Sequence, residues 1–262
     1  MKTMRRSASS PPLTAVNGND TMSRKALVLS SGGIDSTTCL ALAVAELGTE
    51  NVATVSIYYG QKHRVELHAA QAIAKYYGIP QYEFDLSEIL RFSNCALLDG
   101  STQEISHSAY SEQIAENGCK IATYVPFRNG LMLSAAASLA QSLFDTDVCD
   151  LYLGAHADDA AGNAYADCSV PFLNHIGQAI AIGTYDHVRL IAPFARHNKA
   201  SVVAKGLELN APYHLTWSCY EGGETPCGVC ATCRDRAAAF AANGVQDPAL
   251  CCQQEASHAK DK

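Results

Sequence analysis

The chain has 262 residues, of which 48% are hydrophobic and 17% charged, so it can bury one substantial core with a small appendage. A formal net charge of −7 argues against a broad nucleic-acid-binding surface, because binding to phosphates needs clustered lysine and arginine. The longest apolar stretch, residues 131–144, is interrupted by polar side chains and is too short to span a bilayer. We therefore expect a cytoplasmic protein that contacts neither membrane nor nucleic acid directly.

Both ends of the chain have the composition of tails. Residues 1–24 hold too little apolar surface to fold, so we predict a disordered N-terminal tail. Arg5-Arg6 and nearby serines hint at a targeting peptide, but Met22 lies just before the first strand, so a leader or an early start codon explains them as well. Residues 245–262 are polar and predict a flexible C-terminal tail.

Between residues 25 and 215, apolar runs with strand character alternate with helical patterns. Strands are predicted at 26–29, 52–58, 82–84, 148–153 and 188–191, and helices at 35–47, 65–77, 129–143, 171–182 and 198–209. This alternation predicts a doubly wound, mostly parallel α/β sheet. Residues 87–123 are polar and irregular and predict an excursion over the sheet edge. Residues 216–244 follow as a cysteine-rich loop and a helix that ends at Gly244.

A glycine-containing turn, Ser31-Gly32-Gly33-Ile34-Asp35-Ser36, joins the first predicted strand to the first predicted helix. Main-chain N–H groups and the helix dipole make such a position an anion site, and serine hydroxyls can donate to phosphate oxygens. The turn lacks the lysine of a Walker loop and the spacing of a dinucleotide fingerprint. The alternative without a binding function is an ordinary glycine turn with a serine helix cap.

This turn matches in full the Ser-Gly-Gly-x-Asp-Ser signature of the PP-loop ATP pyrophosphatases, and the chain resembles that family. The resemblance implies that ATP, with Mg²⁺, is cleaved between its α and β phosphates and that AMP passes to a substrate oxygen, from which a nucleophile displaces it. It also implies that ATP binds along the turn, at Ser30, Ser31, Gly32, Gly33, Ile34, Asp35, Ser36, Thr37 and Thr38.

Four of the eleven cysteines form the pattern Cys-x7-Cys-x2-Cys-x2-Cys, at Cys219, Cys227, Cys230 and Cys233. Four thiolates at this spacing are typical of a closed, structural Zn²⁺ site. An iron–sulfur cluster is the chemical alternative. We predict a structural zinc that fixes this loop and the following helix to the α/β domain.

Further segments resemble the 7-cyano-7-deazaguanine synthases, a nitrile-forming family within the PP-loop enzymes. The matching segments are 59–66, 125–129, 154–156 with Asp159 and Gly162, Lys199, and 216–220. The resemblance implies a homodimeric ligase of queuosine biosynthesis. It implies that 7-carboxy-7-deazaguanine, ammonia and ATP give 7-cyano-7-deazaguanine through an amide, with each loss of oxygen driven by ATP.

The resemblance also places functional residues in these segments. It implies catalytic roles for Asp35, Ser36, Arg128 and Lys199, and substrate binding by Tyr59, Gln61, His63, Glu66, Arg128, Asn129, His156, Asp159 and Asp167. Arg128 can pair with a carboxylate or phosphate, and Asn129 can hydrogen-bond a purine edge. His63 and Glu66 lie one helical turn apart and can share a face of the pocket. For each residue alone, an ordinary polar contact is the alternative.

One loop departs from the family pattern. Where the family often has Gly-Tyr-Pro-Asp-Cys, this chain has the longer segment 162–168, with Ala166 in place of the proline. The departure leaves open a relative that conjugates the activated deazaguanine to a protein amine. A tRNA-thiolating PP-loop enzyme would need a catalytic cysteine pair and a basic surface, and a zinc module for nucleic acid would need basic residues around the cysteines. The charge pattern supports neither.

Overall fold

The computed structural model describes residues 23–106, 108, 113, 115, 121–161 and 164–250. Most of the predicted N-terminal tail, residues 1–22, lies outside these ranges, as do residues 251–262 of the predicted C-terminal tail. Gly162 and Asn163 of the departing loop also lie outside them. Within the described ranges, no helix combines the length and the apolar character that crossing a membrane requires.

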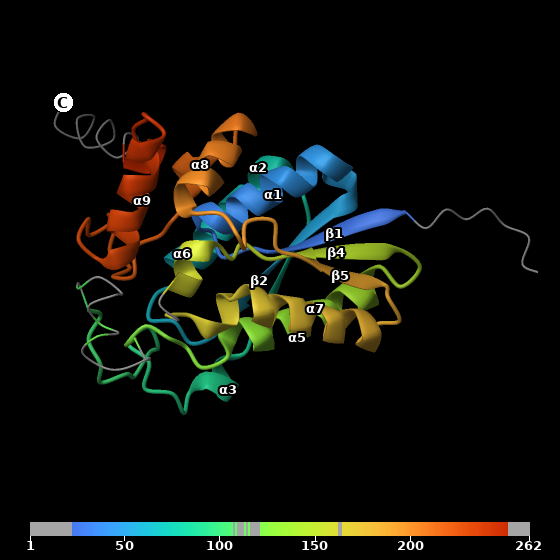
Figure 1. Ribbon diagram of the computed structural model, residues 1–262, viewed down its shortest axis with the longest axis horizontal. Helices are drawn as coiled ribbons and strands as arrows, with labels where there is room; N and C mark the ends of the chain where they lie inside the picture. The colour runs from blue at the N-terminus through green and yellow to red at the C-terminus, as the bar shows by residue number, and fades with distance from the viewer. Residues whose placement is uncertain are drawn as a thin grey trace, which may run out of the picture.

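In the described part of the chain, five parallel strands form one sheet in the order β3-β2-β1-β4-β5 (Figure 1). They are β1 (Arg24–Leu29), β2 (Val52–Tyr58), β3 (Gln81–Asp85), β4 (Val148–Tyr152) and β5 (Val188–Ile191). In register, Ala26 of β1 pairs with Val52 on one side and Asp150 on the other. The strand order reverses at β1, so a crevice opens beyond the carboxyl ends of β1 and β4. The predicted doubly wound, parallel α/β sheet is confirmed.

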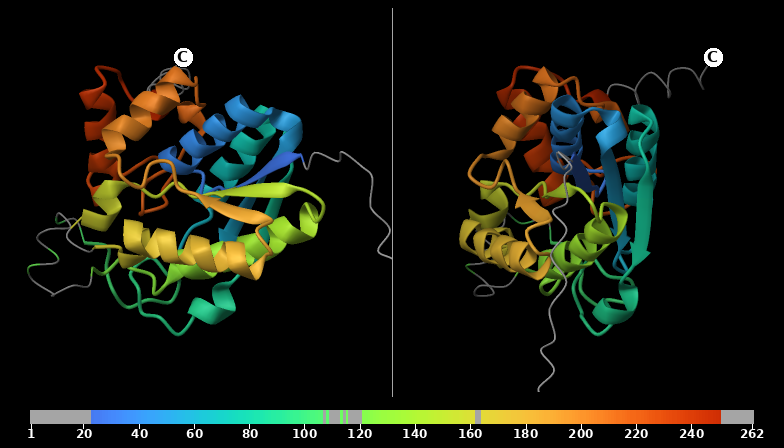
Figure 2. Two further views of the ribbon diagram at one scale, coloured as in Figure 1. Left: turned by 45° about the vertical axis from the view of Figure 1, so that its right-hand side comes forward. Right: turned by 90° about the vertical axis from the view of Figure 1, so that its right-hand side faces the viewer.

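Helices cover both faces of this sheet (Figure 1 and Figure 2). The helices α1 (Ile34–Leu47), α2 (Val65–Tyr77) and α8 (Lys199–Glu208) lie on one face, and α5 (Arg128–Leu143) and α7 (Val170–Gly183) lie on the other. Side chains of β1 alternate between the two layers, since Ala26 and Val28 pack with the first group and Leu27 and Leu29 with the second. Because β1 is buried on both faces, its run of apolar residues is continuous.

The helix ends follow local chemistry. α1 ends at Gly48 and α2 at Gly78, which have φ angles of 79° and 68°, a region that favours glycine. The side chains of Ser169 and Asn198 accept main-chain N–H groups and cap the N-termini of α7 and α8. These signals are readable in the sequence, so the predicted helices begin and end close to the observed ones.

The segment after β3 covers the carboxyl end of β2. It begins with the short helix α3 (Ser87–Leu90) and continues irregularly, with Cys95, Leu97 and Leu98 buried against Tyr59. The other short elements are η1 (Thr49–Asn51), α6 (Ala157–Ala160), η3 (Ala166–Cys168) and η4 (Tyr213–Leu215). The excursion therefore has an apolar underside that helps to close the site.

The helix α9 (Ala231–Ala242) follows the cysteine-rich loop and packs against α8 at the carboxyl end of the sheet (Figure 1). The chain stays packed beyond Gly244, because Asp247 forms a buried ion pair with Arg236 of α9, with 2.5 Å between Oδ2 and Nε. Arg236 also donates to Thr216 Oγ1 at 2.8 Å. Residues 245–250 are therefore part of the packed region, not of the flexible tail predicted for 245–262.

Candidate active site

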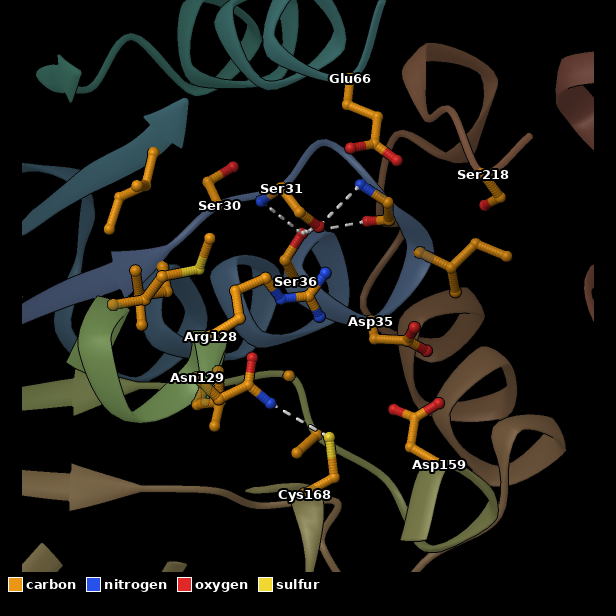
Figure 3. Close-up of a pocket in the computed structure, with 18 of the residues that line it drawn as sticks. Ser30, Ser31, Asp35, Ser36, Glu66, Arg128, Asn129, Asp159, Cys168 and Ser218 are labelled. Atoms are coloured by element: carbon orange, nitrogen blue, oxygen red, sulfur yellow. Dashed lines mark hydrogen bonds between the residues drawn. The ribbon is translucent and has the colours of Figure 1, made fainter. Parts of the chain in front are cut away.

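A pocket lies at the carboxyl ends of β1, β2 and β4 (Figure 3). Its walls come from the turn after β1, the segment after β2, the starts of α5 and α8, and the loop after β4. The sequence-predicted residues that line it are Ser30, Ser31, Gly33, Ile34, Asp35, Ser36, Tyr59, Gln61, Glu66, Arg128, Asn129, Asp159 and Lys199. The fold thus brings most of the predicted site residues into one cavity.

The nucleotide turn, residues 31–36, is held by its own hydroxyl groups. Ser36 Oγ accepts the Ser31 N–H at 3.2 Å and lies 3.1 Å from Ser31 Oγ. The helix α1 has no side-chain cap at its N-terminus. The first N–H groups of a helix lack intrahelical partners, so this end of α1 can bind an anion.

Two glycines let three segments approach each other closely at this turn. A Cβ atom at Gly32, whose φ is 78°, would overlap the carbonyl oxygen of Glu66 in α2. A Cβ atom at Gly154, in the loop after β4, would lie 2.7 Å from the carbonyl carbon of Asp35. Any larger residue would push the loops apart, so the glycines fix the geometry of the crevice.

Thr37 and Thr38, which the sequence predicted to bind ATP, lie behind the turn. Both are fully buried, and neither is among the described residues that line the pocket. The Thr37 hydroxyl donates to the Gly33 carbonyl at 2.7 Å, and the Thr38 hydroxyl donates to the Ile34 carbonyl at 2.9 Å. Gly32 is likewise outside the lining. The helix turns Thr37 and Thr38 away from the cavity, and Gly32 precedes the helix; ATP binding by these three residues stays a prediction.

Four ionisable side chains meet at one end of the pocket. Lys199 Nζ donates to Asp35 Oδ2 at 2.9 Å and lies 3.4 Å from His156 Nε2. The same His156 nitrogen is 3.4 Å from Asp159 Oδ1. Burial would lower the pKa of Lys199, but the carboxylates of Asp35 and Asp159 raise it above its usual range. Lys199 is therefore a fixed positive charge beside the nucleotide turn.

The two carboxylates of this group differ in their environment. Burial would raise the pKa of Asp35, but the charges of Lys199 and His156 bring it below its usual range. Burial raises the pKa of Asp159, against the opposing effect of His156 and Lys199. Asp35 Oδ1 is buried and has no hydrogen-bond partner among the described residues. A buried acceptor of this kind suits a bound cation or a ligand donor.

His156 supports this group from behind. It is 2% exposed, and the described lining of the pocket does not include it. Its Nε2 atom lies 3.7 Å from Asp35 Oδ2. The structure places His156 against the charged side chains, and its contact with substrate stays a prediction.

Arg128 occupies the middle of the pocket, at the start of α5 (Figure 3). Its guanidinium carbon lies 5.4 Å from the centre of the Tyr59 ring. Burial would lower the pKa of Arg128, but the phenol of Tyr59 raises it, so the guanidinium stays charged. The preceding residue, Phe127, has a φ of 51°, which is unusual for a bulky side chain and marks local strain where the chain aims Arg128. The side-chain oxygen of Gln61 accepts the main-chain N–H of Tyr59 at 2.8 Å.

Asn129 also lines the pocket and is fixed by η3. Its main-chain N–H donates to Asp167 Oδ2 at 2.9 Å, and its side-chain nitrogen lies 3.1 Å from Cys168 Sγ. Asp167 is buried and absent from the described lining. Asp167 therefore holds Asn129 and the first turn of α5, and its contact with substrate stays a prediction.

The sequence predicted that His63 and Glu66 share a face of the pocket. They do not, because α2 begins at Val65 and His63 precedes it. Its Nε2 atom lies 3.0 Å from the carbonyl oxygen of Tyr220. Its ring packs on Gly222, where a Cβ atom would overlap it. The described residues that line the pocket include Glu66 but not His63. His63 therefore supports the cysteine-rich loop.

That loop forms a wall of the pocket that the sequence did not predict. The main-chain N–H of Trp217 donates to the Gly32 carbonyl at 2.9 Å, and this hydrogen bond connects the loop to the nucleotide turn. Tyr220 reaches the same pocket and lies 3.4 Å from Tyr165, measured between hydroxyl oxygens. The further lining residues that were missed include Met132, Tyr165, Cys168, Trp217, Ser218, Tyr220 and Thr232. The segment 216–220 was a family match, but its spacing alone gave no reason to place it in the site.

The cysteine cluster can hold a metal ion. The sulfur atoms of Cys219, Cys227, Cys230 and Cys233 all lie within 4.8 Å of one another. Zinc–sulfur bonds of about 2.3 Å in a tetrahedron would place the sulfurs about 3.8 Å apart. A hydrogen bond from Cys233 lowers the pKa of Cys230, so the cluster favours at least one thiolate. The four predicted ligands are thus assembled by the fold.

Comparisons with known proteins give a consistent result. The family model for the queuosine biosynthesis protein QueC matches residues 25–244. A 7-cyano-7-deazaguanine synthase of Archaeoglobus fulgidus is 38% identical over 227 residues, covering 86% of this chain and 90% of that protein. The synthase of Thermoplasma acidophilum is 37% identical over 231 residues, 86% of this chain and 91% of that protein. That of Oceanobacillus iheyensis is 36% identical over 227 residues, 86% of this chain and 97% of that protein.

Likeness to solved structures is weaker. A glutamine-dependent NAD+ synthetase from Acinetobacter baumannii in complex with ADP gives a TM-score of 0.45 at 16% identity, covering 72% of this chain and 29% of that chain. This likeness is too distant to bear on function.

Proposed function

Because this chain belongs to the QueC family, that of the 7-cyano-7-deazaguanine synthases, we propose that it converts 7-carboxy-7-deazaguanine, ammonia and ATP into 7-cyano-7-deazaguanine. One observation carries the proposal: a single pocket joins the uncapped N-terminus of α1 to Arg128, Glu66 and three tyrosines. The first part suits a polyphosphate, and the second suits a flat heterocycle with a carboxylate.

The proposed reaction runs through two adenylylations. A carboxylate oxygen of the substrate attacks the α phosphorus of ATP, and the bond to the β phosphate breaks to release pyrophosphate. Ammonia attacks the acyl carbon, AMP leaves with the former carboxylate oxygen, and loss of a proton gives the amide. The amide oxygen then attacks the α phosphorus of a second ATP and releases a second pyrophosphate. Its carbon–oxygen bond breaks, AMP leaves with the former amide oxygen, and loss of two protons from the nitrogen gives the nitrile.

The residues of the turn and its neighbours bind the phosphates in this proposal. Ser31, Ser36 and the first N–H groups of α1 bind the departing pyrophosphate, and Lys199 neutralises its charge. Arg128 pairs with the substrate carboxylate before adenylylation. Asp35 Oδ1, a buried acceptor without a described partner, would hold Mg²⁺, which supplies further charge neutralisation on the phosphates.

We assign zinc to the cluster of four cysteines. Three of the four side chains, Cys219, Cys230 and Cys233, are buried, and four sulfur ligands leave no open position for chemistry. The metal would therefore be structural. It would hold the loop that carries Ser218 and Tyr220 against the pocket.

Ammonia is the acceptor in this proposal. The described part of the departing loop, residues 164–168, buries Tyr165, Asp167 and Cys168 and serves to hold Asn129, which gives no sign of a surface for a protein acceptor. Thiolation is disfavoured, because Cys168 is the one described cysteine in the pocket lining and burial raises its pKa. The homodimer and the cytoplasmic location stay predictions.

The assay that tests the proposal combines the purified protein with 7-carboxy-7-deazaguanine, ATP, Mg²⁺ and ammonium. Mass spectrometry should show the amide and then the nitrile, with AMP and pyrophosphate as the other products. Release of ADP and phosphate in place of AMP and pyrophosphate would contradict adenylylation. Pyrophosphate release with an adenylate that builds up in excess ammonium would instead point to conjugation with a protein amine.

A further inference from the structure

Glu66 presents a carboxylate to the pocket from the first turn of α2. Figure 3 shows this side chain pointing into the cavity, on the side of the nucleotide turn that faces Ser218. The contact between Gly32 and the Glu66 carbonyl fixes this part of α2 against the turn. Main-chain packing therefore fixes the point from which the Glu66 side chain enters the pocket.

No described residue satisfies this carboxylate. Among the described residues, its oxygens make no hydrogen bond or ion pair, and its electrostatic neighbours are the charge of Arg128 and the phenol of Tyr59. Burial raises the pKa of Glu66 to about 7, although Arg128 opposes the shift. A carboxylate that is half-buried in a cavity without a partner is suited to hydrogen-bond donors on a ligand.

The surroundings of Glu66 suit a planar heterocycle. Tyr59 and Tyr165 are buried, and Tyr220 lies beside Tyr165 in the same lining. Aromatic side chains offer flat surfaces on which nucleobases stack. A base held by these rings would present its edge to the side chains between them, of which Glu66 is the anionic one and Arg128 the cationic one.

The edges of the two bases in the reaction differ in their donors. The pyrimidine ring of a deazaguanine carries two adjacent donors, N1–H and the 2-amino group, which match the two oxygens of a carboxylate. Adenine carries one donor, its 6-amino group, beside an acceptor nitrogen. A carboxylate therefore favours the guanine-type ring and leaves adenine with one unmatched acceptor.

We propose that Glu66 selects the guanine-type substrate by accepting hydrogen bonds from its N1–H and 2-amino groups. The inference rests on the proposed function and adds a specificity role to it. Glu66 fixes which base occupies the tyrosine-lined half of the pocket, while Arg128 meets the substrate carboxylate, which the five-membered ring carries at the other end of the same bicyclic base.

The test compares 7-carboxy-7-deazaguanine with its analogue that lacks the 2-amino group. For the wild type, loss of one hydrogen bond to a charged acceptor should weaken binding and lower kcat/KM by about 10- to 100-fold. In Glu66→Ala the preference should fall close to one, because the group that reads the amino substituent is gone. Glu66→Gln, which keeps the shape and places an amide donor against N1–H, should also lose the preference.

Glu88→Ala is the matched control, since Glu88 lies on α3 with its side chain 81% exposed and should keep the wild-type preference. Calorimetry on both acids without ATP gives a readout independent of turnover, and melting temperatures check the fold of each variant. An unchanged preference in Glu66→Ala and Glu66→Gln would overturn the inference, as would a rise in the KM for ATP alone, which would place adenine beside Glu66.

The two proposals fail in different ways. A wild type that binds and converts both acids equally well would refute the role of Glu66 and leave the reaction standing. A wild type that binds neither acid would refute the proposed function, and the inference would fall with it.

Discussion

Two walls of the same pocket are held in place by different forces. The nucleotide turn stands on the main core, where Ile34, Leu40 and Val28 are buried together between the sheet and α1. The cysteine-rich loop rests on a much smaller apolar cluster, in which Ala69 and Trp217 are joined mainly by cysteines. The first wall is thus built by hydrophobic burial, and the second depends on sulfur ligands and polar contacts.

This difference follows from size. A segment of about thirty residues cannot bury enough apolar surface to fix its own shape, so small units of this kind usually need a metal or another cross-link. Here the four clustered cysteines and the buried pair of Arg236 and Asp247, which also bonds Thr216, hold the loop and α9 together. Damage to the second wall should therefore leave the first one standing.

The largest expected effect is a loss of turnover when polar side chains of the first wall, the nucleotide turn, are removed. Ser36→Ala or Asp35→Ala should lower turnover by at least about 100- to 1,000-fold, because the first removes a hydroxyl that binds the phosphates and the second removes the carboxylate that would hold Mg²⁺. Pyrophosphate release measures the effect. Ser142→Ala, an exposed serine of α5, should keep full turnover. A Ser36→Ala variant with normal rates would remove the nucleotide turn from the mechanism.

The next effect separates the two walls. Cys230→Ser should reduce the metal content from about one ion per chain to almost none, because the buried sulfur of Cys230 is one of four clustered ligands. Hydrogen exchange should then rise in residues 216–244 and stay slow in β1. Cys149→Ala, at a buried cysteine of β4, is the control and should keep the metal. Equal loss of protection in both regions would mean that the walls are one cooperative unit.

The third effect concerns the buried ion pair between α9 and the segment that follows it. Asp247→Ala should lower the free energy of unfolding by about 3–5 kcal/mol, because it leaves the buried guanidinium of Arg236 without its anion. Glu208→Ala removes an exposed partner of Lys205 and should change it by less than about 1 kcal/mol. Urea unfolding of both variants gives the comparison. If Asp247→Ala lost as little free energy of unfolding as Glu208→Ala, the buried pair would not stabilise the second wall.

The two walls also differ in how much the sequence could predict. The strands, helices and nucleotide turn follow local signals, such as the apolar run of β1, the glycines that end α1 and α2, and the Ser-Gly-Gly-x-Asp-Ser signature. The four cysteines are equally local, because their spacing alone marks a metal site. These parts could be predicted because neighbouring residues determine them.

The sequence could not predict the directions of side chains or the contacts between distant segments. Thr37 and Thr38 lie in the signature region, but the helical turn points them at the core. His63 and Asp167 lie in family segments, but they hold Tyr220 and Asn129 in place. Tyr220 itself reaches the pocket only because the C-terminal loop folds back onto the nucleotide turn. No periodicity along the chain carries that information.

The smallest expected effect tests the boundary between the walls, where Glu66 lies. Burial raises the pKa of Glu66 to about 7, so its ionised form predominates above that pH and disappears below it. The carboxylate acceptor is needed for the proposed contact, so the affinity for 7-carboxy-7-deazaguanine should increase about tenfold from pH 6 to pH 8. Calorimetry without ammonium or ATP keeps the titration of ammonia out of the measurement.

Glu66→Gln is the control for this titration. It retains Asp159, whose pKa burial also raises, so the difference between the two pH profiles isolates Glu66. The variant should bind more weakly at pH 8 and show little of the tenfold change. An identical pH profile in wild type and variant would mean that the titrating group lies in the cluster around Lys199, on the side of the first wall. A profile that flattens in the variant would place it where the substrate meets the second wall.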